Sequence, residues 1–169
     1  MKSSVIGIVF SEDKKKILIT KRCDIPIWVF PGGGKEESET PEIAVIRELK
    51  EETGYDVEIV RKIGEYHPLN KLARYTYLFE CKIQSGSRTL SEETREIDWF
   101  FPQKLPKPFL HVHKNWLDDA LQNSRELIKK PIKGTSMVRF VCYLFIHPIL
   151  MFRYILCLLG RPLNTKSQT

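Results

Sequence analysis

Residues 33–55 read GGKEESETPEIAVIRELKEETGY, and the part from Thr40 onward predicts a helix. Thr40 can cap its first turn, Pro41 suits the first helical position, and Gly54 suits the position after the last turn. Apolar residues at three-residue steps predict a stripe that packs against the core. This stripe consists of Ile43, Ile46 and Leu49. We therefore expect one helix between Thr40 and Gly54.

The same helix would carry three carboxylates on one face. At about 100° per residue, Glu51 and Glu52 fall on either side of Glu48, within roughly 100° of arc. Such close like charges repel one another unless a cation compensates them. Carboxylate oxygens suit Mg²⁺ or Mn²⁺, which can neutralise a polyphosphate and activate water. The spacing therefore predicts a divalent-metal site, with Arg47 pairing with Glu51 or Glu39 to hold the carboxylates in place.

Three consecutive glycines, Gly32, Gly33 and Gly34, precede the helix. Glycines let the backbone approach a helix closely and expose N–H and carbonyl groups to metal and phosphate. Together with Pro31 they interrupt the preceding apolar segment, so we expect a loop over Pro31–Gly34.

The spacing over Gly33 to Tyr55 resembles the signature of the Nudix hydrolases, the MutT-like family. That signature is Gly, five residues, Glu, seven residues, Arg-Glu, an apolar residue, any residue, Glu-Glu, any residue, Gly and an apolar residue. The matching residues here are Gly33, Glu39, Arg47, Glu48, Leu49, Glu51, Glu52 and Gly54, with Tyr55 in the last apolar position. The flanking segments around Trp28 and Trp99 are also similar to the family, so the resemblance covers about residues 1–130.

The resemblance implies an α/β fold, the Nudix α/β/α sandwich with a mixed sheet. It also implies an Mg²⁺- or Mn²⁺-dependent hydrolase that cleaves a phosphoanhydride bond in a nucleoside diphosphate linked to another group X. Its metal ligands would be Glu48, Glu51, Glu52 and the carbonyl of Gly32, with Glu48 taking part in base catalysis in some members. Arg47 and Glu39 would orient the helix. Nucleoside triphosphates, dinucleoside polyphosphates, ADP-ribose and nucleotide sugars all stay open as substrates.

A further acidic residue downstream often serves the family as ligand or base. The candidates are Glu80, Glu92, Glu93 and Glu96. We favour Glu93 and Glu96, because they precede the strand around Trp99 in a loop that could bring them to the site. A solvated acidic loop is the alternative for each of them.

Substrate contacts are expected from two basic and aromatic segments. Lys21 and Arg22 end an early strand and could meet phosphates. Arg74, Tyr75 and Tyr77 could bind phosphate or stack a base, although the tyrosines could equally be core residues.

Period-two and apolar segments predict a sheet around this helix. The expected strands are Val5–Phe10 and Lys16–Lys21, forming a hairpin, and Trp28–Phe30, Val57–Ile63, Tyr75–Ile83 and Ile97–Phe101. A second helix is expected over Phe109–Lys129, with an apolar face of Val112, Trp116, Leu117, Ala120 and Leu121. At its start, His111 and His113 are predicted to lie at the surface.

The chain divides into a Nudix domain over residues 1–130 and an apolar, basic, helical tail over residues 131–169. The tail holds five of the 27 Lys and Arg residues and none of the 21 acids. The stretch 137–160 is apolar, but the charge of Arg153 and the bend expected at Pro148 make it unsuited to spanning a bilayer. A membrane-surface helix, a helix packed on the domain, and a homodimer contact stay open.

Charge and cysteine usage limit the remaining possibilities. The body is nearly neutral, so no specific nucleic-acid partner is expected, and the substrate would be a phosphorylated small molecule such as a nucleotide. The four cysteines are widely spaced and predicted to be reduced, and no signal peptide is visible, as in a cytoplasmic protein. Two other functions are considered: a catalytically silent nucleotide-sensing module, which the intact carboxylate set argues against, and a membrane-associated protein with an accessory Nudix domain.

Overall fold

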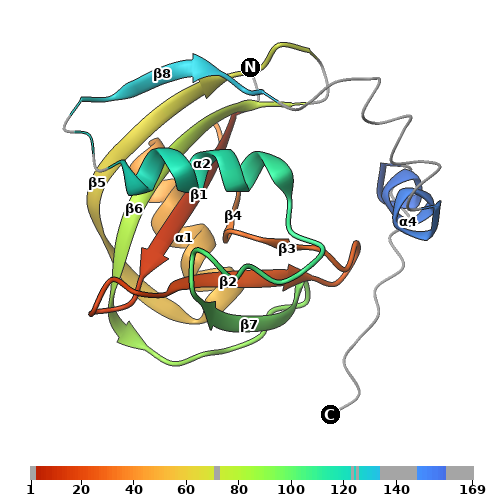
Figure 1. Ribbon diagram of the computed structural model, residues 1–169, viewed down its shortest axis with the longest axis horizontal. Coiled ribbons are helices and arrows are strands. Elements are labelled where there is room, and N and C mark those ends of the chain that lie inside the picture. Colours follow the sequence, from red (N-terminus) through yellow and green to blue (C-terminus); the bar gives the residue numbers. More distant parts are fainter. Residues whose placement is uncertain (1–2, 71–72, 123, 125, 134–147, 159–169) are drawn as a thin grey trace.

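The computed structural model describes residues 3–70, 73–122, 124, 126–133 and 148–158. Within them, one eight-stranded sheet runs in the order β3-β2-β1-β6-β5-β8, with β4 paired to β1 and β7 to β2 (Figure 1). The strands are β1 (Ser3–Phe10), β2 (Ile17–Arg22), β3 (Trp28–Val29), β4 (Gly32–Gly34), β5 (Tyr55–His67), β6 (Tyr75–Gly86), β7 (Thr94–Phe100) and β8 (Ile128–Pro131). The helices are α1 (Pro41–Thr53), α2 (His111–Leu121) and α4 (Pro148–Leu158).

The sheet is mixed, as predicted. β1 and β2 form the expected antiparallel hairpin, with Val9 opposite Leu18. β6 then runs parallel to β1, and β8 runs parallel to β5, while β5 and β6 are antiparallel. Figure 1 shows α1 and α2 on opposite faces of this sheet.

Each face of the sheet has its own apolar core. On one face, Ala44, Val45 and Leu49 of α1 pack in a buried cluster with residues of β1, β5 and β6. On the other face, Trp116 and Leu117 of α2 belong to a second buried cluster with residues of β1, β2 and β6. Burial on both faces is the pattern expected of a sheet covered by helices.

Helix α1 begins and ends where the sequence predicts. The Thr40 side chain accepts a hydrogen bond from the Ile43 N–H at 3.3 Å, Pro41 opens the helix, and Gly54 ends it in the left-handed conformation at φ 78°. The helix also lies unusually close to β1. A Cβ added at Gly7 would be 2.7 Å from Cδ1 of Leu49, so the glycine allows this approach.

The predicted apolar stripe of α1 is wrong for two of its three residues. Leu49 is fully buried, but the Ile43 and Ile46 side chains are 57% and 40% exposed. At about 100° per residue, Glu52 lies only about 20° from Val45 around the helix axis. The inward face is therefore shared between small apolar residues and a carboxylate, which turns both isoleucines toward solvent.

Two other expected elements differ. The segment Pro31–Gly34 is not entirely loop, because Gly32–Gly34 pairs with β1 as β4, with Gly33 opposite Val5. The second helix ends at Leu121 rather than Lys129. Its expected last residues belong to β8, which pairs with β5, and the following Ile132 is buried in the core. Pairing along an available sheet edge outweighs the helical pattern there.

His113 is a core residue, contrary to the predicted surface position. It is 6% exposed, stacks on the Phe30 ring, and accepts a hydrogen bond from the Phe30 N–H on Nδ1 at 2.8 Å. Burial lowers the pKa of His113 to about 3, so this residue is a neutral structural group. His111, two residues earlier, is exposed as expected.

In the tail, α4 is the longest described segment, whereas residues 137–147 and 159–160 of the predicted apolar stretch lie outside the described residues. Among the helices that the structure describes, none has the length and apolar character needed to cross a bilayer. Cys23 and Cys81 are buried and free. Cys142 and the Cys157 side chain lie outside the described part of the chain.

Candidate active site

The three carboxylates of α1 line one pocket together with the glycines of β4. Its wall is completed by the segment between β6 and β7, and its volume is about 390 Å³, within the usual range for small-molecule sites. The lining residues are Gly33, Gly34, Glu48, Glu51, Glu52, Ser91, Glu92 and Glu93. Residues far apart in the sequence thus bring five carboxylates to one place.

Arg47 holds this cluster together. Its guanidinium donates to Glu39 at 2.7 and 3.1 Å, and to Glu48 and Glu51 at 3.0 Å each. It also donates to the carbonyl of Gly34 at 3.1 Å, which joins α1 to β4. The sequence predicted pairing with Glu51 or Glu39, and Arg47 pairs with both. A planar guanidinium with five N–H groups suits this multiple role, which a lysine could not fill.

Glu52 is the most deeply set of the three helix carboxylates. Its Oε2 accepts the main-chain N–H of Gly32 at 2.9 Å. Burial raises the pKa of Glu52 to about 7, against the opposing influence of that N–H and of the Arg22 charge. Burial also raises the pKa of Glu48, which Arg47 partly opposes. Burying like charges side by side is unfavourable, so a cation bound in this part of the site would relieve their repulsion.

The glycines of β4 make room for these carboxylates. A Cβ at Gly33 would lie 2.6 Å from Cδ of Glu48, inside van der Waals contact. At Gly32 the backbone has φ 145°, and a Cβ would overlap the carbonyl oxygen of Val5. A Cβ at Gly34 would meet only Arg74, at 3.8 Å. The first two glycines are therefore required by close approach.

The chemistry of these oxygen donors fits a hard divalent cation. The carboxylate oxygens, however, do not converge on one point in this structure. Within the described ranges, no three His, Cys, Asp or Glu side chains are positioned as they stand to hold a metal ion. Glu48 and Glu51 are drawn toward Arg47, and Glu52 toward Gly32. Carboxylate oxygens beside a glycine strand nevertheless form an all-oxygen set, which Mg²⁺ and Mn²⁺ prefer.

Of the acidic residues proposed downstream, Glu92 and Glu93 line the pocket, whereas Glu96 and Glu80 are outside it. The Glu93 charge raises the pKa of both Glu48 and Glu52, as a nearby carboxylate would. Glu96 instead pairs with Lys21 at 2.8 Å. Glu80 is buried between Lys14 and Arg61, at 3.4 and 2.7 Å.

The basic residues that were expected to bind substrate differ in the side chains that they contact. Besides its pairing with Glu96, Lys21 lies over the Trp28 ring, 5.4 Å from the centroid. Arg22 donates from Nε to Asp24 at 2.8 Å, and its charge acts on Glu52. Arg74 is exposed beside Gly34, at the edge of the pocket.

The tyrosines of β6 form a small cluster of their own. The Tyr75 hydroxyl donates to Glu65 at 2.7 Å, and this hydrogen bond raises the pKa of Tyr75 to about 12. Its ring lies 5.1 Å from that of Tyr77, over which Lys62 sits. Both tyrosines are half-buried, so their rings are largely engaged with neighbouring side chains.

Two residues were not identified from the sequence: Ser91, which lines the pocket, and Asp24, the partner of Arg22. The Ser91 hydroxyl accepts the N–H groups of Glu93 and Thr94 and so shapes the segment that carries Glu93. Asp24 pairs with Arg22 and accepts the Ile25 N–H. Ser and Asp side chains often accept the backbone N–H groups of residues one to three positions later in a turn. This tendency could have indicated both Ser91 and Asp24 as turn residues.

Comparison with known proteins agrees with the geometry. The family model described as "NUDIX domain" matches residues 1–120. A MutT-like protein of Streptomyces ambofaciens is 35% identical over 121 residues, which cover 72% of this chain and 77% of that protein.

Solved structures give the same result for the fold. A NUDIX hydrolase from Nitrosomonas europaea superposes with a TM-score of 0.67 at 24% identity, covering 78% of each chain. An ADP-ribose pyrophosphatase from Streptococcus suis superposes with a TM-score of 0.61 at 25% identity, covering 77% of this chain and 98% of that one. Family members typically use a divalent metal and act on nucleotide-type phosphorylated substrates. The chain therefore belongs to the Nudix family and is a Nudix pyrophosphohydrolase.

Proposed function

We propose that this protein is an Mg²⁺-dependent hydrolase whose metal is held by Glu48, Glu51 and Glu52, with the Gly32 carbonyl as a further ligand. It would cleave a phosphoanhydride bond in a nucleoside diphosphate linked to a second group. The observation that carries the proposal is the shared pocket, in which these three carboxylates and Glu93 meet the glycines of β4. The complete carboxylate set also argues against a catalytically silent sensor.

The chain's own residues have separable tasks in this reaction. Bound Mg²⁺ would neutralise the polyphosphate and lower the pKa of water. Arg47 keeps Glu48 and Glu51 on the pocket side of α1 through its hydrogen bonds. A water deprotonated in the pocket then forms a new P–O bond as the bridging anhydride oxygen leaves with the other product.

Glu93 is the residue we assign to accept the proton of the attacking water. It faces Glu48 and Glu52 across the pocket from a separate segment, whereas Glu96 is engaged by Lys21. Glu93→Gln is expected to lower kcat by roughly a hundredfold or more, since general-base catalysis contributes at that level. Glu96→Gln is the matched control and should keep kcat within a few fold. Equal effects of both substitutions would contradict this assignment.

The substrate is proposed to be a nucleotide with a charged diphosphate linkage, bound by Arg74 at the pocket edge and by Arg22. ADP-ribose belongs to this class and is the substrate named for the Streptococcus suis structure. Arg74→Ala should raise KM with little change in kcat if the guanidinium binds substrate and transition state equally. A fall in kcat at constant KM would give Arg74 a different role.

A substrate panel tests the proposed function. Purified protein with Mg²⁺ would be assayed on nucleoside triphosphates, dinucleoside polyphosphates, ADP-ribose and nucleotide sugars, following release of phosphate or nucleoside monophosphate. We expect turnover that EDTA abolishes and Mg²⁺ restores. Measurable binding of these compounds without any hydrolysis would refute the proposal and favour a nucleotide sensor.

A further inference from the structure

Helix α4 is attached to the catalytic domain through Arg153. Arg153 donates from Nε to the carbonyl of Asp24 at 2.6 Å and from Nη2 to the carbonyl of Cys23 at 2.8 Å. The neighbouring Met151 side chain is only 8% exposed. These contacts join α4 to the turn that follows β2, where Asp24 also pairs with Arg22.

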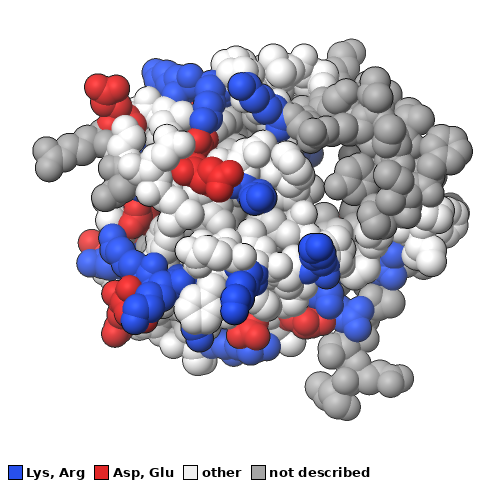
Figure 2. Space-filling model, viewed as in Figure 1, with Lys and Arg blue, Asp and Glu red and all other residues white. Residues whose placement is uncertain are grey.

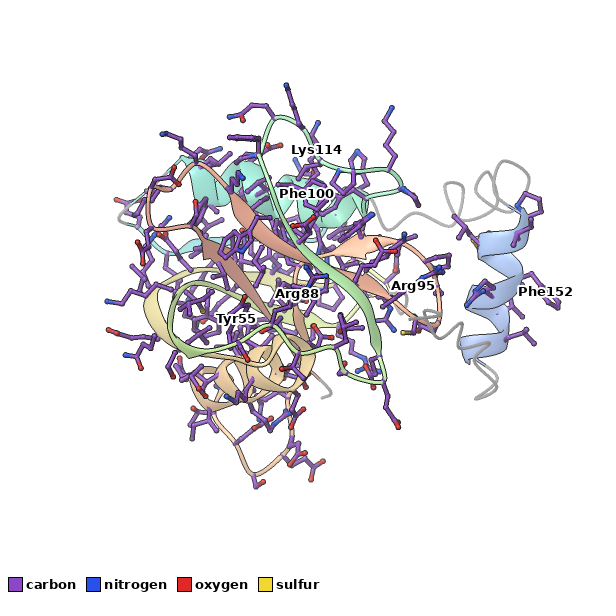
Figure 3. The ribbon with its side chains drawn as sticks, turned by 90° about the horizontal axis from the view of Figure 1, so that it is seen from below. Tyr55, Arg88, Arg95, Phe100, Lys114 and Phe152 are labelled. Carbon is purple, nitrogen blue, oxygen red and sulfur yellow. The ribbon has the colours of Figure 1, made fainter. Side chains whose placement is uncertain are left out.

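One face of α4 is apolar and exposed. Ile149, Phe152 and Ile155 are 76%, 58% and 38% exposed. At about 100° per residue they occupy roughly 120° of arc centred on Phe152, and Met151 and Arg153 flank this arc, each about 40° beyond one of its ends. Figure 3 shows the Phe152 side chain pointing away from the domain. The helix therefore presents an apolar face outward, and Arg153 at the border of this face holds the helix to the domain.

The sequence charge of the tail distinguishes the partners that this face could bind. Residues 131–169 carry five Lys and Arg and no acid, which accounts for +5 of the net charge of +6. Residues 1–130 are nearly neutral, and on the face that Figure 2 shows their positive and negative side chains are interspersed. Pairing two copies through α4 would bring two such basic tails together, which is unfavourable. An anionic lipid surface would neutralise them instead.

We propose that α4 binds the surface of an anionic bilayer. Ile149, Phe152 and Ile155 would enter the boundary between headgroups and acyl chains, and the net positive charge of the tail would attract the anionic headgroups. Arg153 would keep the catalytic domain attached to the bound helix. The helix would lie in the plane of the interface, in agreement with the lack of a span-length apolar helix among the described residues.

Co-sedimentation of the full chain with vesicles tests this proposal. The vesicles are pure phosphatidylcholine, or phosphatidylcholine with a substantial fraction of phosphatidylglycerol. We expect partitioning to the anionic vesicles that weakens at high salt. The double variant Ile149→Ser/Phe152→Ser should bind roughly tenfold more weakly or worse, because burying one large apolar side chain already contributes a factor of that order. Leu121→Ser, which removes a 48% exposed apolar residue on α2, is the matched control and should bind like the parent.

Each outcome decides the question. Equal sedimentation of parent and double variant, or equal binding to neutral and anionic vesicles, would overturn the proposal. Self-association in analytical ultracentrifugation that the double variant abolishes, without vesicle binding, would assign the face to a second copy of the chain. Basal hydrolysis and thermal unfolding of both variants should match the parent, so a folding defect would be detected separately.

Discussion

The main-chain N–H of Gly32 donates to the carboxylate of Glu52 at 2.9 Å, joining the glycine strand to the last turn of α1. This contact holds one carboxylate in the pocket, where we propose that it also binds the metal.

Glu52→Gln should therefore keep the hydrogen bond, because the amide oxygen can still accept, while losing the charge. We expect kcat to fall by roughly two orders of magnitude or more, because the substitution disturbs the binding of a metal ion that would supply several kcal/mol of transition-state stabilisation. The control is Glu42→Gln, an exposed acid on the same helix but outside the pocket. Addition of Mg²⁺ should raise the melting temperature of the parent and not of Glu52→Gln. Full Mg²⁺-dependent turnover in Glu52→Gln would remove this residue from the site.

Gly33→Ala tests how tightly β4 fits the carboxylates. The new methyl group would overlap the Glu48 carboxyl group, whereas Gly34→Ala would meet only Arg74 at ordinary contact distance. We expect Gly33→Ala to lower kcat/KM by roughly ten- to a hundredfold through displacement of Glu48, because displacements on the ångström scale cost this much. Gly34→Ala should stay within a few fold of the parent. Similar losses in both variants would show that the fit at Gly33 is not the cause.

The variant Arg47→Lys tests whether Arg47 positions the carboxylates through its hydrogen-bond geometry or only through its charge. A lysine keeps the charge but cannot make the hydrogen bonds to Glu39, Glu48, Glu51 and Gly34 at once. We expect the apparent Mg²⁺ affinity, measured from the metal dependence of activity, to fall roughly ten- to a hundredfold. An unchanged metal dependence would leave charge as the only contribution of Arg47.

The buried, neutral His113 should make stability depend on pH. Its pKa is about 3 in the folded protein and 6.5 in the reference state, so between these values the unfolded chain binds the additional proton. The contribution of His113 to the free energy of unfolding should therefore be fully present above about pH 6.5. Below that pH the free energy of unfolding should fall by up to about 1.4 kcal/mol per pH unit.

His113→Gln should remove this contribution, even if its stability is lower at every pH. Urea unfolding between about pH 5 and pH 8 would measure the slope. His111→Gln, at an exposed position on the same helix, should keep the slope of the parent. A slope unchanged by the loss of His113 would mean that other groups account for the acid sensitivity.

The sequence predicted the parts of the candidate site that come from one continuous helix. Thr40, Pro41 and Gly54 define α1 through local capping chemistry, and the spacing of Glu48, Glu51 and Glu52 follows from helical geometry alone. These features depend on neighbours within a few residues, so they can be recognised without knowledge of the fold.

The predictions from sequence were wrong where contacts between residues distant in the chain determine the local structure. Ile43 and Ile46 were expected to be buried, but the inward face of α1 is occupied by Ala44 and Val45 and by the approach of Glu52 to Gly32. The helical pattern after Leu121 gave way to β8, because β5 offers a free edge there. No local signal distinguishes a glycine run in a loop from one paired to a distant strand, so β4 was missed.

The close approach of Leu49 to Gly7 has a consequence for how this enzyme could change over evolutionary time. With no space between α1 and β1, the wall of the pocket that carries the helix carboxylates is fixed to the sheet. The opposite wall, with Ser91, Glu92 and Glu93, comes from a segment outside the helices and strands. Substitutions that give related enzymes a new substrate should therefore accumulate in the second wall, while the first is inherited unchanged.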